Sequence, residues 1–463
     1  MRQIGTSYPE HEDLLRMLES FVRTAADPQL VRINPVRFAV QRGIDDATAI
    51  DLFLHGRKAG LFTMEWQYVC PGCGDIVESF HSLNSASAHY FCDVCSTERE
   101  ADLSEFIEIT FTVSRAVRES RYHDPGALDA EAYTLFYRFT ENGVVDGGSS
   151  LRDFYRRSAV ILAYVEPGET RSFHVELEPG LLLFTDGPVV EVNKGLDHRN
   201  EPIAYTFRTS HAPTQKAAIA PGRLEFIFTN ATTKRNALLG INIADHYSIT
   251  LERFLSGARL LSSQTFLDLF PSETVVSGEG LTVKRIALLF TDIKGSTALY
   301  DRIGDMKAFD LVRQHFGLLR DAIASNSGAL VKTIGDAVMA SFHQPLDALR
   351  AALDMRREIT RFNATAGEEL ITLKIGAHVG TCLAVTLNGQ LDYFGQAVNL
   401  AARVQGLAES NEICLSEEMF QLPGAAELLA AYELDTRSMR VKGIDREIVV
   451  HRVHANPLSA VPL

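Results

Sequence analysis

The first 65 residues place apolar side chains at the spacing of helices. One helix is predicted from about Glu10, with five apolar residues on one face: Leu14, Leu15, Met17, Leu18 and Phe21. Two shorter helices are predicted over 35–42 and 46–61, with Gly43 in the turn and Asp45 or Asp46 as the cap of the second. This pair has the outline of a helix-turn-helix, but we favour a small helical packing unit over a DNA reader.

The apolar period changes to two between about Leu103 and Asn242, which is typical of strands. Apolar positions alternate or form short runs in four places: 106–111, 173–177, 181–184 and 224–228. Turn signals such as Glu178-Pro-Gly180 separate these segments. We therefore predict a β-sandwich-like domain here, with a small barrel as the alternative. No group of side chains in it is typical of a catalytic site.

A helix is predicted over 251–270, with Thr250 as its cap and Glu252 in its first turn, and a loose linker follows. From residue 283 to 455, short strands alternate with long amphipathic helices. The chain is thus predicted to be a multidomain α+β protein. Its five parts are a helical segment, a cysteine-rich segment, a β-rich domain, a helix with linker and an α/β domain: 1–65, 66–100, 101–250, 251–282 and 283–455.

The predicted α/β domain begins with a buried strand over 285–290. A helix over 306–323 follows, and we interpret its periodic apolar residues as core packing: Met306, Phe309, Val312, Phe316, Leu319 and Ile323. Two strands over 328–342 fold at Gly335-Asp336, a hairpin signal. Another strand pair is predicted over 371–380 and 382–387, and the chain enters a helix from Asp392.

Composition narrows the classes of function. The 463 residues are 46% hydrophobic and carry 45 Lys and Arg against 59 Asp and Glu, a formal charge of -14. Disordered, collagen-like and coiled-coil chains are excluded, and phosphate backbones or anionic membranes would repel so acidic a chain. We find no signal peptide and no apolar run long enough for a membrane span, so we expect a soluble cytoplasmic protein without nucleic-acid or membrane partners.

Four of the six cysteines form two pairs, Cys70-Pro-Gly-Cys73 and Cys92-Asp-Val-Cys95, with 18 residues between them. Two such pairs at this spacing are typical of a zinc ribbon, whereas a single pair would leave a redox dithiol equally open. Four thiolates fill all the tetrahedral positions of zinc, so we predict one structural Zn²⁺. We expect His81 and His89, between the pairs, to be ordinary histidines rather than replacement ligands.

Several polar residues of the α/β domain could bind a nucleotide and its metal ions. Asp292 ends the first strand, and Gly295, Ser296 and Thr297 then open a helix whose N–H groups could hold a phosphate. Asp336 at the hairpin tip could join Asp292 in holding two magnesium ions. Taken singly, each aspartate is as well explained by a cap or a turn. Asn399 and Arg403, four residues apart, share one helical face.

Four segments carry a resemblance to a family: FTDIKGST at 290–297, KTIGDAVMA at 332–340, DYFGQAVNLAAR at 392–403 and VKG at 441–443. Together they resemble the class III nucleotide cyclase catalytic domain in order and spacing. The resemblance implies a ferredoxin-like βαββαβ core that works as a homodimer with its active sites at the subunit interface. The front half also resembles, less specifically, the segments that precede this domain in some bacterial cyclases.

The resemblance also implies roles for single residues. Asp292, Asp336 and the Ile293 carbonyl look like ligands of two Mg²⁺ or Mn²⁺ ions, held by one subunit. The partner subunit would supply four residues, of which the first two read the purine, the third orients the ribose and the last stabilises the transition state: Lys332, Asp392, Asn399 and Arg403. Lys442 resembles a lysine that binds the triphosphate, and Lys294 stands where many bacterial members have an apolar residue.

The resemblance favours an adenylate cyclase that converts ATP to 3′,5′-cyclic AMP and pyrophosphate. Lys332 suits the acceptor N1 of adenine, and Asp392 suits its 6-amino group. Guanylyl-specific members usually carry Glu and Cys there, so a guanylate cyclase is one alternative. A nucleotide-binding regulator associated with DNA is another. The N-terminal region is expected to be regulatory, with an unidentified ligand or protein as its signal.

Overall fold

The computed structural model describes residues 12–454 except 96, 186, 188, 197–200, 209–215, 245, 276–279, 367–370 and 441–446. The chain forms two compact units. The N-terminal unit comprises residues up to 81, 89–101 and 106–255, and the C-terminal unit comprises 82–88, 102–105 and everything from 256. The five-part division made from the sequence is finer and stays a prediction. None of the helices in the described ranges combines the length and the apolar character needed to span a bilayer.

The N-terminal unit opens with helices that pack on a sheet. The helices are α2 (Glu12–Thr24), η1 (Asp27–Leu30), α3 (Pro35–Arg42) and α4 (Asp46–Lys58). Gly43 ends α3 in the left-handed region at φ 66°, and the Asp45 carboxylate caps α4 by accepting from the Thr48 N–H at 2.8 Å. The predicted turn and cap are confirmed. The Phe53 ring stacks on Phe62 of the sheet, so α4 uses this face for packing.

The sheet under these helices has the order β2-β1-β5, with strands Ile76–Phe80, Phe62–Val69 and Ile107–Val113. The hairpin of β3 (His89–Cys92) and β4 (Thr97–Glu100) belongs to the same unit. All seven residues of β5 are buried. Its sequence nevertheless alternates apolar and polar residues, and the buried Glu108 on its polar face accepts hydrogen bonds from Thr140 and Asn142.

Residues 114–158 differ from the sequence prediction of a continuous β-rich region. They form short helices and two small strands: η3 (Arg121–His123), η4 (Pro125–Ala127), α5 (Ala130–Tyr133), η5 (Thr134–Arg138), β6 (Gly143–Val145), β7 (Ser149–Ser150) and α6 (Leu151–Ser158). Ser120, Asp129 and Ser150 each accept a hydrogen bond from a backbone N–H at the start of a helix. These local caps give the backbone an alternative to strand pairing.

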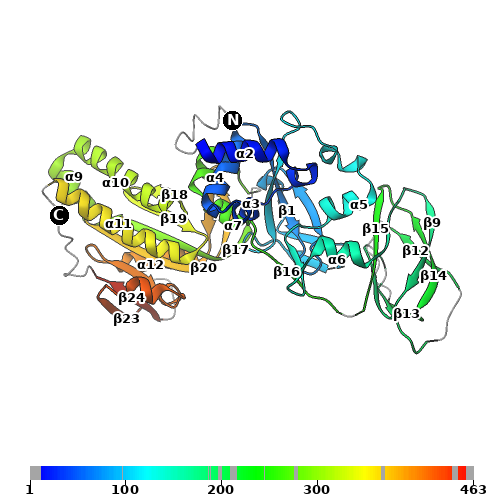
Figure 1. Cartoon of the computed structure of the whole chain (residues 1–463). Coiled ribbons are helices and arrows are strands. Elements are labelled where there is room, and N and C mark those ends of the chain that lie inside the picture. Colours follow the sequence, from blue (N-terminus) through cyan, green and yellow to red (C-terminus); the bar gives the residue numbers. More distant parts are fainter. Residues whose placement is uncertain are drawn as a thin grey trace. The chain divides into compact units, whose positions relative to one another are not determined.

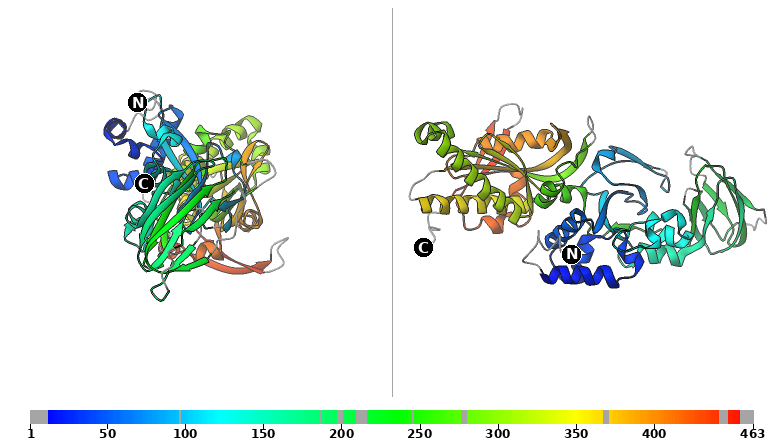
Figure 2. Two further views of the ribbon diagram at one scale, coloured as in Figure 1. Left: turned by 90° about the vertical axis from the view of Figure 1, so that its right-hand side faces the viewer. Right: turned by 90° about the horizontal axis from the view of Figure 1, so that it is seen from above.

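Two sheets lie beyond this helical part and share one hydrophobic cluster. The first has the order β13-β11-β10-β15-β8 (Lys216–Ile219, Val189–Val192, Gly180–Phe184, Asn236–Ile243, Ala159–Val165), and the second has the order β12-β14-β9 (Ile203–Phe207, Gly222–Asn230, Thr170–Leu177). Phe226 and Phe228 of β14 contact Phe184 of β10 across the cluster. Figure 2 shows these strands in green as two layers.

The predicted helix over 251–270 is wrong. Thr250 lies in β16 (Ile249–Leu251), which pairs with β6, and two short helices follow, α7 (Gly257–Leu261) and α8 (Gln264–Leu269). Ser256 caps α7 and Ser263 caps α8 by accepting a hydrogen bond from a backbone N–H. A second capping serine begins a new helix where the apolar pattern alone suggests continuation.

The C-terminal unit is built on one sheet of order β18-β19-β17-β20-β22-β24-β23, with β21 beside β20. In chain order its strands are Leu281–Ile293, Gly328–Ile334, Ala337–Phe342, Leu373–Leu387, Gln390–Phe394, Ile413–Ser416, Leu434–Arg440 and Glu447–Val453, for β17 to β24. The helices are α9 (Ser296–Ile303), α10 (Asp305–Ser325), α11 (Pro345–Ala366), α12 (Gln396–Gly406), α13 (Glu417–Phe420) and α14 (Ala425–Leu429). In Figure 1, α10 and α11 run side by side on the sheet.

The order from β17 to β20 is strand, helices, strand, strand, helix, strand, and β17 lies between β19 and β20. This is the βαββαβ core predicted for the C-terminal domain. The core of α10, α11, α13, α14 and the sheet is one cluster, and Val404 of α12 belongs to another with Cys414 and Val450.

Three local predictions in this unit are wrong. β20 is one continuous strand of 15 residues rather than a strand pair, and Asp392 lies in β21 before the helix begins. Met306 and Phe309 are 78% and 65% exposed, although their spacing predicted a place in the core. The buried face of α10 instead carries Ala308, Leu311, His315 and Leu319. Both faces of this helix hold apolar residues, so the period alone does not decide which one packs.

Segment 82–88 of the cysteine-rich stretch and segment 102–105 just after it belong to the C-terminal unit. In segment 102–105, the Leu103 N–H donates to the Thr282 carbonyl at 2.9 Å, and Asp102 forms an ion pair with Lys284 at 2.8 Å. In segment 82–88, the hydroxyl of Ser82 and the N–H of Leu83 donate to one oxygen of Glu273. These segments complete the surface around α7, α8 and the start of β17.

Candidate active site and cysteine cluster

Asp292 and Asp336 come together at the end of β17 and the tip of the β18–β19 hairpin. Gly335 turns the hairpin at φ 64°, and the Val338 N–H donates to the Thr291 hydroxyl at 3.2 Å, which joins the two strands beside the carboxylates. Burial and the neighbouring charge of Asp336 raise the pKa of Asp292. Among the described residues, the buried Oδ2 of Asp336 accepts no hydrogen bond. Two close carboxylates with an unpartnered oxygen suit divalent cations, whose preferred ligands are oxygens.

The helix α9 begins next to this pair. Gly295 precedes it in the left-handed region at φ 69°, and no side chain caps its first N–H groups. Ser296 and Thr297 open the helix, where a free N-terminus favours an anion such as a phosphate. Tyr300 of the same helix lies close enough to the site that burial and Asp336 raise the pKa of its hydroxyl. The sequence reading did not single out Tyr300, which looks like an ordinary apolar-face residue.

Lys332 and Asp392 meet across β18 and β21. The Lys332 ammonium donates to Asp392 Oδ2 at 2.5 Å, and the other carboxylate oxygen accepts from the Tyr393 N–H at 2.8 Å. The Asp392 side chain is only 9% exposed, whereas that of Lys332 is 37% exposed. The pair therefore offers one donor and one acceptor at a single place, even though the two residues are 60 positions apart in sequence.

Asn399 and Arg403 lie on α12 with exposed side chains. Their helix packs very closely on β20, because a Cβ added to Gly376 would lie 2.2 Å from the Gln405 backbone nitrogen. No hydrogen bond or ion pair among the described residues joins Asn399 or Arg403 to the two aspartates. Lys442 and the VKG segment lie outside the described residues. Lys294 donates to the Ser410 hydroxyl at 2.6 Å.

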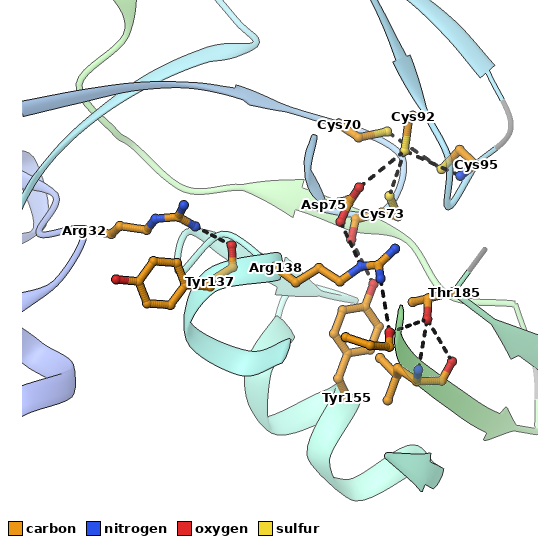
Figure 3. A network of polar contacts seen from close by, with 12 residues as sticks. Arg32, Cys70, Cys73, Asp75, Cys92, Cys95, Tyr137, Arg138, Tyr155 and Thr185 are labelled. Atoms are coloured by element: carbon orange, nitrogen blue, oxygen red, sulfur yellow. Dashed lines mark hydrogen bonds and ion pairs between the residues drawn. The ribbon is translucent and has the colours of Figure 1, made fainter. Parts of the chain in front are cut away.

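The four predicted cysteine ligands converge in the N-terminal unit, and their sulfur atoms all lie within 4.8 Å of one another. Figure 3 shows the four side chains pointing toward a common centre. Cys70 and Cys95 are 3.7 Å apart and Cys73 and Cys92 are 3.6 Å apart, too far for disulfides. Four sulfurs in this arrangement could hold a metal ion, and neither His81 nor His89 is part of the group.

A network around the cysteines was not found from the sequence. Asp75, 5% exposed, approaches the Cys92 sulfur and accepts from the Arg138 Nε at 3.3 Å (Figure 3). Arg138 also donates to the Ala237 carbonyl, and the Tyr155 hydroxyl donates to the Cys73 carbonyl at 2.8 Å. These bonds fix the first cysteine turn against the helical part and β15. The acidic residue two positions after the first pair was the available signal for such support of the ligands.

Two family models match the chain. One, described as a family of unknown function, DUF5939, matches residues 9–268, more than half of the sequence. The chain belongs to the DUF5939 family. The other, described as the adenylate and guanylate cyclase catalytic domain, matches residues 281–454. The C-terminal unit thus carries a class III nucleotide cyclase catalytic domain.

Several curated relatives match part of the chain. An adenylate cyclase of Anabaena cylindrica is 29% identical over 189 residues, which are 38% of this chain and 38% of that protein. An uncharacterized protein of Mycobacterium tuberculosis is 33% identical over 168 residues, 36% of this chain and 41% of that protein. An adenylate cyclase of Mycosarcoma maydis is 30% identical over 159 residues, 30% of this chain and 6% of that protein. The DUF5939 chain thus covers less than half the length of these relatives.

Solved cyclase structures also match. The adenylyl cyclase CyaB from P. aeruginosa has 22% identity and a TM-score of 0.34, and the match covers 38% of this chain and 96% of that one. The guanylate cyclase domain of RhGC from Catenaria anguillulae in complex with GTP has 22% identity and a TM-score of 0.34, over 38% and 98% of the two chains.

Proposed function

We propose that this DUF5939 protein is an adenylate cyclase that converts ATP to 3′,5′-cyclic AMP and pyrophosphate. The observation that carries the proposal is the pair of Lys332 and Asp392, held together at 2.5 Å. A protonated amine can donate only, and an ionised carboxylate can accept only. Adenine presents an acceptor at N1 beside a 6-amino donor, which this pair complements. Guanine presents a donor at N1 beside an acceptor oxygen, so it would have to meet the ammonium and the carboxylate in the reverse order.

Two Mg²⁺ or Mn²⁺ ions fit the aspartate site. Asp292 and Asp336 would hold them, with the Ile293 carbonyl as a further ligand, and the unpartnered oxygen of Asp336 supports this assignment. Bound ions of this kind lower the pKa of a hydroxyl and neutralise phosphate charge. Gly295, Ser296 and Thr297 would hold triphosphate oxygens at the start of α9, and Lys442 would add a cation there.

In the proposed reaction, the ribose 3′ oxygen bonds to the α-phosphorus as the bond to the bridging oxygen of pyrophosphate breaks. Arg403 would donate to the α-phosphoryl oxygens as their charge grows, and Asn399 would orient the ribose. Both side chains are exposed on α12, so they are available to a nucleotide.

A homodimer completes this site in the proposal. Asp292 and Asp336 would come from one subunit. Its partner would supply the other four residues: Lys332, Asp392, Asn399 and Arg403. Exposed apolar residues support an interface: Ile334 at the hairpin end, Leu383 and Phe394 are 52%, 37% and 65% exposed. Exposed apolar side chains on strands of one sheet are typical of surfaces that contact another protein.

The N-terminal unit would be regulatory, with one structural Zn²⁺ on Cys70, Cys73, Cys92 and Cys95. Zinc prefers four thiolates in such closed sites, and the Asp75–Arg138 bond would support the first cysteine turn.

Cyclic nucleotide production tests the proposal. The purified full-length protein should form cyclic AMP from ATP with Mg²⁺ or Mn²⁺ and little cyclic GMP from GTP. The double variant Lys332→Glu, Asp392→Cys should reverse that preference, because it replaces the donor and acceptor with groups suited to guanine. A wild-type rate with GTP above that with ATP would overturn the adenylate assignment in favour of a guanylate cyclase.

A further inference from the structure

A pocket of about 440 Å³ lies in the C-terminal unit, and its lining includes neither the two aspartates nor Lys332 and Asp392. Its walls come from α8, α10, β18 and β21 and from the turn after α8. The volume is within the range of small-molecule sites in proteins. Nothing in the proposed cyclase reaction uses this space.

Most of the residues that line the pocket are apolar or lack a side chain. Seven apolar residues line it: Leu267, Phe270, Pro271, Phe316, Leu330, Val331 and Leu391. Gly317 lies within the 21-residue helix α10, and a Cβ added there would meet nothing within 4 Å. A glycine inside a helix costs about 1 kcal/mol of stability relative to alanine. Close packing against a neighbour does not explain Gly317, because the space beside it is open. Instead the glycine leaves room in the pocket.

The charges that line the pocket do not balance. Asp268 forms an ion pair with Arg320 and accepts from the Gln264 side chain at 2.9 Å. Glu273 accepts at one oxygen from two neutral donors, the Ser82 hydroxyl at 2.9 Å and the Leu83 N–H at 3.2 Å. Within the described part of the chain, no lysine or arginine forms an ion pair with Glu273. One negative charge in the lining is therefore left without a cationic partner.

We propose that this pocket binds a small organic cation with an apolar body, of the class of aromatic or alkyl amines. The ammonium group would donate to Glu273, and the apolar body would lie among Phe270, Phe316 and Leu391. A charged hydrogen bond is stronger than a neutral one, and the apolar residues of the lining would contact the body of the ligand. A second nucleotide is a poor match, because the one arginine in the lining is already paired with Asp268.

Two residues of the pocket lining are sequence neighbours of Lys332 and Asp392, the pair proposed to bind the purine. Val331 and Leu391 line the pocket, and each directly precedes a member of that pair. An occupied pocket would contact β18 and β21 next to Lys332 and Asp392, so binding gives a route for a small cation to affect nucleotide binding. The binding inference itself does not depend on the cyclase reaction.

Isothermal titration of the full-length protein with tryptamine tests the inference, with indole-3-propionate as an anionic analogue of similar size. Tryptamine should bind once per chain, and the anion should bind at least tenfold more weakly. Glu273→Gln removes the charge and should weaken tryptamine binding at least tenfold, whereas Glu427→Gln, at an exposed carboxylate of α14, should leave it unchanged.

Glu273→Gln also alters the hydrogen bond from Ser82, so a second variant tests the pocket with Glu273 left intact. Gly317→Leu fills the pocket from α10 without touching Glu273 and should also abolish binding, with unfolding temperature measured for both variants. Equal binding of tryptamine and the anion, unchanged binding in Gly317→Leu, or no binding by wild type at about 1 mM would overturn the inference.

Discussion

The contact between Gly376 and α12 predicts a large effect from one added methyl group. In Gly376→Ala, the new Cβ would lie 2.2 Å from the Gln405 backbone nitrogen, whereas ordinary van der Waals contact begins at 3.4 Å. The obstacle is helix backbone, which cannot rotate away as a side chain can. The helix must therefore move outward by about 1 Å, or β20 must bend.

The expected cost follows from what α12 carries. Overpacking of this kind costs about 1–3 kcal/mol of unfolding free energy. Displacement of catalytic groups by about 1 Å costs on the order of a hundredfold in rate. Because Asn399 and Arg403 are on the displaced helix, we expect cyclic AMP production to fall about a hundredfold while the protein stays folded.

Gly406→Ala is the matched control on the same helix, because its Cβ would meet nothing within 4 Å. This variant should keep full activity and gain up to about 1 kcal/mol of stability. Rates from cyclic nucleotide assays and unfolding temperatures from calorimetry would be compared for both variants. If Gly376→Ala matched the Gly406→Ala variant in rate and stability, the close packing of α12 on β20 would be refuted.

Three further predictions concern other sites. Asp292→Asn and Asp336→Asn should each lower cyclic AMP production at least about a hundredfold with unchanged unfolding temperature, because they remove metal-binding charge; activity near the wild-type level would refute the role in metal binding. Cys95→Ser should lower the bound zinc measured by atomic emission and destabilise the N-terminal unit by several kcal/mol, whereas a full zinc content would rule out a four-thiolate site. Burial raises the pKa of Glu108 to about 7, so its ionisation opposes folding and stability should fall by roughly 3 kcal/mol as the pH rises from about 4.5 to above 7. Thermal unfolding of Glu108→Gln should lack that fall, and an equal fall in the variant would assign it to other groups.

The sequence predicted which polar side chains lie together better than it predicted the path of the chain. Asp292, Asp336, Lys332 and Asp392 lie in short motifs, so they could be named from the sequence. The structure places Asp292 near Asp336 and Lys332 beside Asp392. Asp75 and Arg138 could not be paired, because their contact depends on a fold that joins residues 63 positions apart.

The elements that were missed share a physical cause. The continuation of a helix past residue 262 and the face that α10 buries are decided by tertiary packing and by caps such as Ser263. Met306 and Phe309 show the limit most clearly, because two apolar faces give the same period. Only the packed sheet determines which face is covered.

The segments 82–88 and 102–105 change how the cyclase domain can be isolated. A fragment that starts at residue 256 or later loses the Leu103 hydrogen bond to Thr282, leaves Lys284 without Asp102 and uncovers Glu273. A start at residue 283 also removes the first two residues of β17. A slower truncated enzyme would then reflect a damaged domain as readily as the loss of a regulator. Point variants in the intact chain separate these two causes.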